Sequence, residues 1–463
     1  MKPLLLEEIR HVLHAEKKTV LSKGLVTGVK IDSRQLQPGD LFVAIRGARF
    51  DGHDFIAQAA DKGAKAIIVD RDIPLPEQVT RNEISVLKVA NTVEALGSLA
   101  QYYRRSLGSS VDVIGVTGSN GKTTVREMIY HTLSYKRRGY SSPKNYNNQI
   151  GVPITLFGID SDHDFAVVEM GSNAPGEIAG LSRIAEPDVA VITHVGASHL
   201  EGLKDIDGVS AEKVSIVTGL RQRGVVVCGT EHGPTLEKIR TLDKGVITFG
   251  LDESCDVYAT DVKRIQGGIR FLTNDHCDIL LPLLGLHNVR NALAALAVVR
   301  RLGMTTAEFA RAIAEFRPVD RRMVPQEVNG ITIIDDSYNA NPVSMKAALE
   351  ELTSRADAQR RVLVCGDMNE LGDHSDKYHR ELGRMVAASN IDLLFAVGES
   401  AALTARAALE AGMGWSNVQR IVGSKRLARL IKSMIHNGDV ILVKGSRAME
   451  MEKVVASLAR WKG

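Results

Sequence analysis

The stretch "VDVIGVTGSNGKTT" at residues 111–124 joins an apolar run to a glycine-rich turn that ends in a lysine and two threonines. The apolar run predicts a buried strand, and "VREMIYHTLSYKR" (125–137), with apolar residues at helical spacing, predicts a helix directly after the turn. Gly118 and Gly121 permit positive φ, which lets backbone N–H groups come close to oxygen atoms. The N-terminus of the helix carries partial positive charge at the same place. We therefore expect a strand–loop–helix unit that binds phosphate.

The side chains of the turn add chemistry that suits a triphosphate. The general phosphate-loop pattern is Gly, four residues, then Gly-Lys-Ser/Thr, and this chain has Val116 where the first glycine would stand. Lys122 is placed to reach the outer phosphates, and Thr123 is placed to bind a magnesium ion. The alternative interpretation is a tight strand-to-helix turn with an incidental lysine.

Length and composition exclude several classes of protein. A chain of 463 residues is expected to form two to four domains. It is 44% hydrophobic and 24% charged, as is usual for a globular protein, and its net charge of +3 gives no argument for nucleic acid. The densest basic cluster, "YKRRGY" at 135–140, is interpreted as a solvated helix end.

Cysteine usage and the N-terminus favour a cytoplasmic protein. The four cysteines are widely spaced and form no Cys-x-x-Cys pair, so neither a zinc site nor a disulfide framework is expected. The N-terminal "MKPLLLEEIRHVLHAEKK" (1–18) predicts an amphipathic helix and not a signal peptide. No run approaches about 18 uninterrupted apolar residues, so no membrane span is expected.

Alternating strand and helix patterns divide the chain into three α/β units at 1–107, 108–315 and 316–463. The central unit has continuous apolar runs, which suit a parallel sheet covered on both faces; they are "FAVVEMG" (165–171), "PDVAVITHVG" (187–196) and "GVVVCG" (224–229). The last unit has four strand-like runs, at 330–338, 360–368, 391–400 and 438–447. Polar or glycine residues follow each run, at the edge where open α/β sheets bind ligands.

The string "TGSNGKTT" (117–124) resembles the nucleotide loop of the Mur ligase superfamily, the ATP-dependent ligases of peptidoglycan precursor synthesis. Folylpolyglutamate synthases share a related loop. The resemblance implies three domains, with a central P-loop-type parallel sheet and a Rossmann-like C-terminal domain. It also implies that ATP is bound by the whole loop, which consists of Thr117, Gly118, Ser119, Asn120, Gly121, Lys122, Thr123 and Thr124.

Three further segments resemble the metal-binding parts of the family. Glu169 in "VEMGSN" and His199 in "THVGASHLEGL" are implied ligands of two magnesium ions, together with Thr123. "GVSAEKVSIVTGL" (208–220) resembles the helix that carries a carbamylated lysine, here Lys213. Carbamylation replaces an ammonium by a carboxylate, which a metal ion attracts. Lys122, His199 and Lys213 are thus the implied catalytic residues.

The resemblance also implies nucleotide contacts beyond the loop. "GLHNVRNALAA" (285–295) places Asn288 and Asn291 on one helix face, where amides pair with an adenine edge, although capping of the helix by Asn288 is an alternative. Family members usually have Gly-Arg where this chain has Arg321-Arg322, and Arg322 is the implied contact. Asp336 is the implied partner of the ribose hydroxyls.

The remaining motifs point to the substrates. "IDSRQLQPGDLFVAIRGARFDGHDF" (31–55) resembles the region that holds the uridine end of a nucleotide sugar, and "NYNNQIGVP" (145–153) the region that faces the muramoyl group. "CGDMNELGDHSDKYH" (365–379) and "DDSYNANP" (335–342) resemble members that add D-alanyl-D-alanine to UDP-N-acetylmuramoyl-tripeptide. The implied substrate-binding residues are Asp32, Ser33, Arg34, Asn147, Asn148, Tyr338, Asn339, Lys444 and Arg447.

These motifs predict an ATP-dependent ligase that acts through an acyl phosphate, with ATP and magnesium as cofactors. The expected domain roles are binding of the UDP-sugar (1–107), of ATP (108–315) and of the incoming dipeptide (316–463). A monomer is expected. The alternatives are another Mur ligase, a folylpolyglutamate synthase-like amide ligase, or a phosphate-loop protein that uses nucleotide only as a switch.

Overall fold

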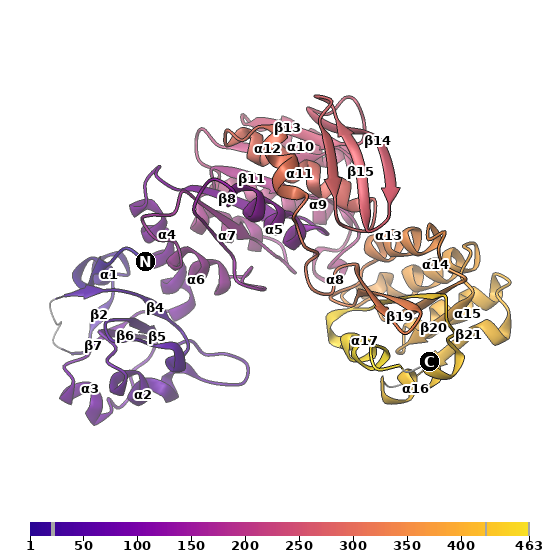
Figure 1. The fold of residues 1–463 in the computed structure, drawn as a ribbon. Helices are drawn as coiled ribbons and strands as arrows, with labels where there is room; N and C mark the ends of the chain where they lie inside the picture. The colour runs from indigo at the N-terminus through magenta and orange to yellow at the C-terminus, as the bar shows by residue number, and fades with distance from the viewer. Residues whose placement is uncertain (20–23, 422–423, 462–463) are drawn as a thin grey trace.

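Three sheets, one after another along the chain, carry the structure in a computed structural model (Figure 1). It describes residues 1–19, 24–421 and 424–461. The three bodies lie in an open chain, with the central one between the other two (Figure 1). Each sheet is covered by helices, so the predicted α/β class with three domains is confirmed.

The N-terminal body has a five-stranded sheet in the order β2-β7-β6-β5-β4 and a small pair, β1-β3. The predicted amphipathic helix within residues 1–18 is α1, which buries Leu6 and Ile9. The strands are β1 (Leu4–Leu5), β2 (Glu16–Lys17), β3 (Leu25–Val26), β4 (Val29–Lys30), β5 (Leu41–Val43), β6 (Ala66–Val69) and β7 (Ser85–Lys88). The helices are α1 (Leu6–Val12), α2 (Ile56–Asp61), α3 (Glu77–Arg81) and α4 (Thr92–Ser106).

The central body has a nine-stranded sheet in the order β16-β15-β14-β13-β12-β11-β8-β10-β9. Strands β9 to β13 and β8 are parallel, as the apolar runs predict, because both faces are buried. Its strands are β8 (Asp112–Thr117), β9 (Gly139–Ser141), β10 (Phe165–Glu169), β11 (Val189–Ile192), β12 (Val225–Gly229), β13 (Gly245–Gly250), β14 (Val257–Ile265), β15 (Gly268–Thr273) and β16 (Asp278–Leu281). The antiparallel part, β14 to β16, was not predicted.

Helices of the central body pack on both faces of its sheet (Figure 1). They are α5 (Lys122–Leu133), α6 (Gly151–Phe157), α7 (Glu177–Ala185), α8 (Leu200–Leu203), α9 (Ile206–Val214), α10 (Gly233–Arg240), α11 (His287–Arg301) and α12 (Thr306–Ile313). Helix α11 is buried along most of its length against α5 and the strands β12 to β14. It therefore fixes α5, and with it the glycine loop, to the sheet.

The C-terminal body has six strands in the order β17-β18-β22-β19-β20-β21, of which only the edge strand β17 is antiparallel. The four predicted strands are present, and β17 and β21 are additional. The strands are β17 (Val324–Val328), β18 (Ile331–Asp336), β19 (Arg360–Gly366), β20 (Leu393–Val397), β21 (Val418–Ile421) and β22 (Asp439–Lys444). The helices are α13 (Pro342–Thr353), α14 (Ser375–Ala387), α15 (Ala401–Glu410), α16 (Ser424–Met434) and α17 (Glu452–Leu458).

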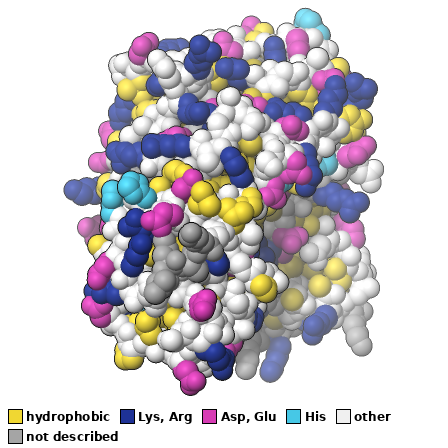
Figure 2. All heavy atoms as spheres, turned by 90° about the vertical axis from the view of Figure 1, so that its left-hand side faces the viewer, with side chains coloured by type: hydrophobic (Ala, Val, Ile, Leu, Met, Phe, Trp, Pro, Cys, Tyr) yellow, Lys and Arg dark blue, Asp and Glu magenta, His cyan; other side chains and the backbone are white. Residues whose placement is uncertain are grey.

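The surface of the N-terminal end carries charges of both signs. Basic and acidic side chains are interspersed on this face and do not gather into one patch (Figure 2). All four cysteines are free thiols. Among the helices that the structure describes, none combines the length and the apolar character needed to cross a bilayer.

Candidate active site

The glycine loop lies between the end of β8 and the start of α5, as predicted. Gly118 has φ 144° and Gly121 has φ 83°, a region that side-chain-bearing residues rarely adopt. A Cβ at Gly118 would lie 2.1 Å from Thr193 Oγ1, and one at Gly121 would lie 2.4 Å from Asn291 Oδ1. Both glycines are therefore required by conformation and by space, and the loop is held against β11 and α11.

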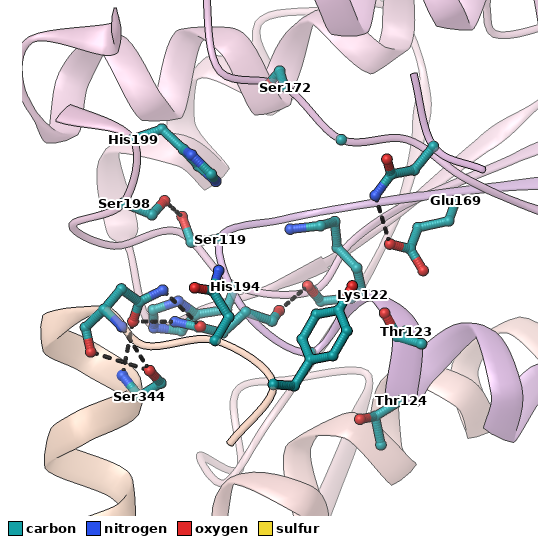
Figure 3. Close-up of a pocket in the computed structure, with 18 of the residues that line it drawn as sticks. Ser119, Lys122, Thr123, Thr124, Glu169, Ser172, His194, Ser198, His199 and Ser344 are labelled. Carbon is teal, nitrogen blue, oxygen red and sulfur yellow. Dashed lines mark hydrogen bonds between the residues drawn. The ribbon is translucent and has the colours of Figure 1, made fainter. Parts of the chain in front are cut away.

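Lys122 projects into the pocket from the first turn of α5 (Figure 3). Its Nζ donates a hydrogen bond to the carbonyl of Gly118 at 2.7 Å, so the ammonium folds over its own loop. Burial lowers the pKa of Lys122, while the carboxylates of Glu169 and Glu370 oppose that shift. A cation at this point, beside backbone N–H groups, suits the outer phosphates of a nucleotide.

Serine hydroxyls build the wall behind the loop. Ser119 Oγ donates to the carbonyl of Gly196 at 2.9 Å and accepts from Ser198 Oγ at 2.9 Å (Figure 3). The N–H of Ser119 also donates to the carbonyl of His194 at 2.7 Å. These hydrogen bonds attach the segment after β11 to the glycine loop. His199, which follows Ser198 in this segment, lines the same pocket.

Glu169 ends β10 and faces Lys122 across the pocket (Figure 3). Its Oε1 accepts from Asn147 Nδ2 at 3.0 Å, and its Oε2 accepts from Arg126 Nη1 at 3.0 Å. The structure therefore brings together two of the predicted residues, Glu169 and Asn147. The contribution of Arg126 was not predicted, although it lies one helical turn after Lys122 and so faces the same side of α5.

Lys213 is fully buried on α9. Its Nζ donates to Ser172 Oγ at 2.7 Å, and Ser172 lines the pocket. Burial, and secondarily the positive charge of Lys122, lowers the pKa of Lys213 to about 7. A large share of this amine is therefore neutral at physiological pH, which is the form that reacts with carbon dioxide.

The predicted metal ligands surround Lys122 and do not form one cage. In the part of the chain that the structure describes, the only three His, Cys, Asp or Glu side chains with ligand atoms within 4.8 Å of each other are Asp160, Asp162 and His163, outside this pocket. Glu169 and His199 lie apart on opposite sides of Lys122 (Figure 3). The buried carboxylate of Glu169 and the hydroxyl of Thr123 are oxygen donors that suit a hard cation, and Lys213 would add oxygen donors as its carbamate.

The two predicted asparagines of α11, Asn288 and Asn291, are hydrogen-bonded to each other. Asn291 Nδ2 donates to Asn288 Oδ1 at 2.8 Å, and Asn288 Nδ2 donates to the carbonyl of Leu284 at 2.7 Å. Both line the pocket on one face of the helix, as predicted. The alternative of capping by Asn288 is wrong, because α11 begins at His287 and its N-cap residue, Leu286, makes no side-chain cap.

The C-terminal domain contributes Arg322 to the wall of the cavity. The guanidinium of Arg322 lies 4.2 Å above the ring of Tyr338 and donates to Thr123 Oγ1 at 2.9 Å. Arg321, where family members usually have glycine, has φ 60° and so keeps the left-handed conformation that glycine adopts easily. The local turn therefore survives the substitution.

Lys444 and Asp336 form a buried ion pair at 2.7 Å, and Lys444 Nζ also donates to the carbonyl of Asn339 at 2.9 Å. The lysine is thus engaged within its own domain. Arg447 is exposed and pairs with Glu452 at 2.7 Å. All the predicted residues of this domain line the same pocket, namely Arg322, Asp336, Tyr338, Asn339, Lys444 and Arg447.

The pocket is a cavity of about 1590 Å³ that all three domains line. The N-terminal domain supplies one face of α4, including Gly97, Ser98 and Gln101. The predicted residues Asp32, Ser33 and Arg34 do not line it; Asp32 and Arg34 pair with each other at 2.8 Å, and Ser33 donates to Gln58 at 2.5 Å. Asn148 lines the cavity, and its Oδ1 accepts from the N–H of Gly151, the first residue of α6.

The sequence did not predict the contacts that residues near the glycine loop make with the C-terminal domain. Asn120 and Asn341 exchange amide hydrogen bonds of 3.2 and 2.8 Å, and Asn341 is also the N-cap of α13. His199 Nδ1 lies 2.5 Å from Glu370 Oε2, and this contact lowers the pKa of Glu370. The motif "NANP" predicts a helix cap, but no local pattern names its partner 221 residues away.

His287, beside the predicted asparagines, predicts a measurable pH dependence. Burial, reinforced by Lys444, Arg290 and His194, lowers its pKa from 6.5 to about 4. Between these values the unfolded chain binds the proton and the folded chain does not, so stability rises with pH and is lost as pH falls. We expect the free energy of unfolding to fall by about 3–4 kcal/mol in all as the pH drops from above 6.5 to below 4, at roughly 1.4 kcal/mol per pKa unit.

Urea denaturation at pH 4.5, 5.5 and 6.5 measures this contribution. His287→Gln is expected to flatten the rise, whereas His276→Gln, at an exposed turn, is expected to leave it unchanged. An equal slope in wild type and His287→Gln would show that other groups carry the pH dependence.

The fold and the site define a nucleotide-binding α/β protein whose phosphate loop is completed by a second sheet domain. Family models match in three consecutive parts: "Mur ligase family, catalytic domain" at residues 25–104, "Mur ligase middle domain" at 116–299, and "Mur ligase, glutamate ligase domain" at 321–447. The chain belongs to the Mur ligase family.

Relatives that match over almost their full length indicate which branch of the family this chain resembles. The UDP-N-acetylmuramoyl-tripeptide–D-alanyl-D-alanine ligase of Bacillus subtilis is 36% identical over 94% of this chain and 93% of its own. The enzyme of that name from Escherichia coli is 36% identical over 93% of both. The crystal structure of MurF from Acinetobacter baumannii superposes with a TM-score of 0.89, 31% identity and 99% coverage of each chain. The crystal structure of MurF ligase from Thermotoga maritima in complex with ADP superposes with a TM-score of 0.82 and 29% sequence identity. The match covers 94% of this chain and 97% of that one.

Proposed function

We propose that the protein joins D-alanyl-D-alanine to UDP-N-acetylmuramoyl-tripeptide with ATP, giving UDP-N-acetylmuramoyl-pentapeptide, ADP and phosphate for peptidoglycan synthesis. The names of its full-length relatives support this assignment. The observation that carries it is the position of Lys122 and Glu169 in one cavity lined by three domains, because three substrates must converge there.

The chemistry follows from the poor reactivity of a carboxylate. The terminal carboxylate of the tripeptide attacks the γ-phosphorus of ATP, ADP leaves, and an acyl phosphate forms. The amine of D-alanyl-D-alanine then attacks the acyl carbon, loses a proton, and phosphate leaves. Lys122 and the loop N–H groups offset the charge on the transferred phosphoryl group, and positioning supplies much of the rate.

Magnesium would be held by Thr123, Glu169, His199 and carbamylated Lys213, and would neutralise phosphate charge. The chain's own part is to hold these donors in place. Arg126 and Asn147 orient Glu169, and Ser172 holds the Lys213 amine toward the cavity wall. Carbamylation joins the neutral amine to carbon dioxide and releases one proton.

The other predicted residues receive roles by domain. In residues 1–107, Asp32, Ser33 and Arg34 hold the uridine end of the sugar nucleotide. In 108–315, Asn288 and Asn291 face the adenine, and Asn147 and Asn148 face the muramoyl group. In 316–463, Arg322 and Asp336 bind the nucleotide, while Tyr338, Asn339, Lys444 and Arg447 line the space for the dipeptide. We propose a cytoplasmic monomer, consistent with the free thiols.

A ligation assay tests the function. Purified protein receives ATP, magnesium, UDP-N-acetylmuramoyl-tripeptide and D-alanyl-D-alanine, and the pentapeptide is measured by mass spectrometry. Parallel reactions replace the acceptor by UDP-N-acetylmuramoyl dipeptide or folate, and the donor by single amino acids or glutamate. Product only in one of these parallel reactions would assign another ligase, and ATP hydrolysis without any acceptor would assign a nucleotide switch.

Carbamylation of Lys213 predicts a specific isotope signal. Protein equilibrated with ¹³C-bicarbonate near pH 8, above the lysine's pKa of about 7, is expected to show one carbamate carbonyl resonance by NMR. Lys213→Arg is expected to lack that resonance and to lose activity by at least about 100-fold, the scale seen when one charge-stabilising group is removed. Lys136→Arg, at an exposed surface lysine, is the matched control. A resonance that persists in Lys213→Arg would assign the carbamate to another lysine.

A further inference from the structure

A loop of the C-terminal domain clasps both ends of the short helix α8 in the central domain. The N–H of Glu201 donates to the carbonyl of Glu370 at 3.2 Å, and His374 Nε2 lies 3.1 Å from the carbonyl of Lys204, the residue that follows α8. A Cβ at Gly372 would lie 3.2 Å from Glu201 Cα, so the two segments pack closely. His199 immediately precedes α8 and is therefore held from across the domain boundary.

The side chains of His199 and Glu370 meet at the centre of this contact. His199 Nδ1 lies 2.5 Å from Glu370 Oε2. Both residues have left-handed backbones, with φ of 52° and 62°, a conformation that non-glycine residues keep only where the surroundings hold it. The His199 ring is 18% exposed, and both side chains line the active-site cavity.

A carboxylate at one ring nitrogen determines what the other nitrogen can do. Glu370 Oε2 lies 2.5 Å from Nδ1, which has no other hydrogen-bond partner among the described residues. A carboxylate at this distance favours the tautomer with the proton on Nδ1, which leaves the lone pair on Nε2. Histidines that bind metal ions characteristically donate their second N–H to a carboxylate or carbonyl, and loss of that partner weakens metal binding by about 10- to 100-fold.

We infer that Glu370 is a positioning residue that orients His199 for metal binding and that does so from a different domain. The inference rests on the proposed function, since it takes His199 as a magnesium ligand. It makes the ligand set of the central domain dependent on the C-terminal domain. Metal affinity is then highest only when the loop around Glu370 is seated on α8.

Manganese binding in place of magnesium tests the inference without turnover. The full-length protein is mixed with an ATP analogue that cannot transfer its γ-phosphate, and free Mn²⁺ is measured by electron paramagnetic resonance. Glu370→Ala is expected to weaken nucleotide-dependent Mn²⁺ binding by about 10-fold or more. Glu370→Gln, whose carbonyl still accepts a hydrogen bond, is expected to recover part of the loss. Glu253→Ala, at an exposed glutamate after β13 that does not line the cavity, is the control and is expected to bind Mn²⁺ as wild type does.

A double-variant comparison separates positioning from a general structural effect. If Glu370 acts through His199, the double variant His199→Ala/Glu370→Ala binds Mn²⁺ no more weakly than His199→Ala alone. Additive losses, or unchanged affinity in Glu370→Ala, would overturn the inference while leaving the ligation activity of wild type as evidence for the proposed function. Unchanged affinity in His199→Ala would remove the metal role of His199 and this inference together. Thermal unfolding of each variant confirms that it is folded.

Discussion

Alanine in place of Lys122 is expected to lower kcat for ligation by about 1000-fold, which corresponds to roughly 4 kcal/mol of transition-state stabilisation. The ammonium is the cation that projects from the glycine loop into the cavity, and it faces Glu169 there (Figure 3). Its present bond to the Gly118 carbonyl has to be exchanged for phosphate oxygens when nucleotide binds. In Lys122→Ala, the negative charge on the transferred phosphoryl group is therefore left without its nearest protein cation.

The measurement separates binding from chemistry. Nucleotide affinity is determined by titration calorimetry, and single-turnover formation of the pentapeptide is followed by rapid quench. Lys136→Ala, past the far end of α5 and exposed, is the matched control. A wild-type rate for Lys122→Ala would contradict the role of the loop in phosphoryl transfer, whatever the effect on affinity.

Methionine in place of Arg104 is expected to destabilise the junction of the first two domains by about 2–4 kcal/mol, because three carbonyls and Asp188 lose a buried donor, although Asp188 keeps its pair with Arg221. Arg104 is 1% exposed at the end of α4. Its guanidinium donates to Asp188 at 2.7 Å and to the carbonyls of Gly108, Ala185 and Glu186. Methionine fills similar volume but satisfies none of these acceptors.

Hydrogen–deuterium exchange locates this effect. Amides of β8 and α7 are expected to exchange faster in Arg104→Met, whereas tryptophan fluorescence should change little at low urea, because Trp415 and Trp461 both lie in the C-terminal domain. Arg105→Met is the matched control, since Arg105 is exposed and pairs only with Glu186; a loss under about 1 kcal/mol is expected there. Equal losses in the two variants would refute the special role of the buried arginine.

The strands that were predicted are those buried on both faces. Continuous apolar runs identify β8, β10, β11 and β12 because helices cover both sides of a parallel sheet. The antiparallel strands β14 to β16 were not predicted because many of their residues are polar and exposed. In β14, for example, most residues toward the C-terminal end are exposed. A turn signal was nevertheless present, since Asn329-Gly330 joins β17 to β18 with positive φ at both residues, as a two-residue hairpin requires.

The candidate site was predictable where one segment carries the chemistry. The loop, its lysine and its glycines are recognised from the local sequence, and Glu169, at a strand end, was expected through the family resemblance. The contacts of Asn120 with Asn341 and of His199 with Glu370 do not, because they depend on how two separately folded domains meet. Arg126 was missed for another reason: it is a surface-type residue that is buried here, where it donates a hydrogen bond to the cavity-lining carboxylate of Glu169.

The reciprocal amide pair between Asn120 and Asn341 constrains how this chain could have diverged. A chimera that takes its C-terminal domain from a distant homologue would keep three folded sheets. It would, however, contain only one of the two residues of each interdomain hydrogen-bonded pair. Residues on either side of the boundary must therefore change together or not at all. Recombination between lineages is then expected to fail at the seam before β17 wherever the partners of Asn120 and Asn341 are not exchanged together.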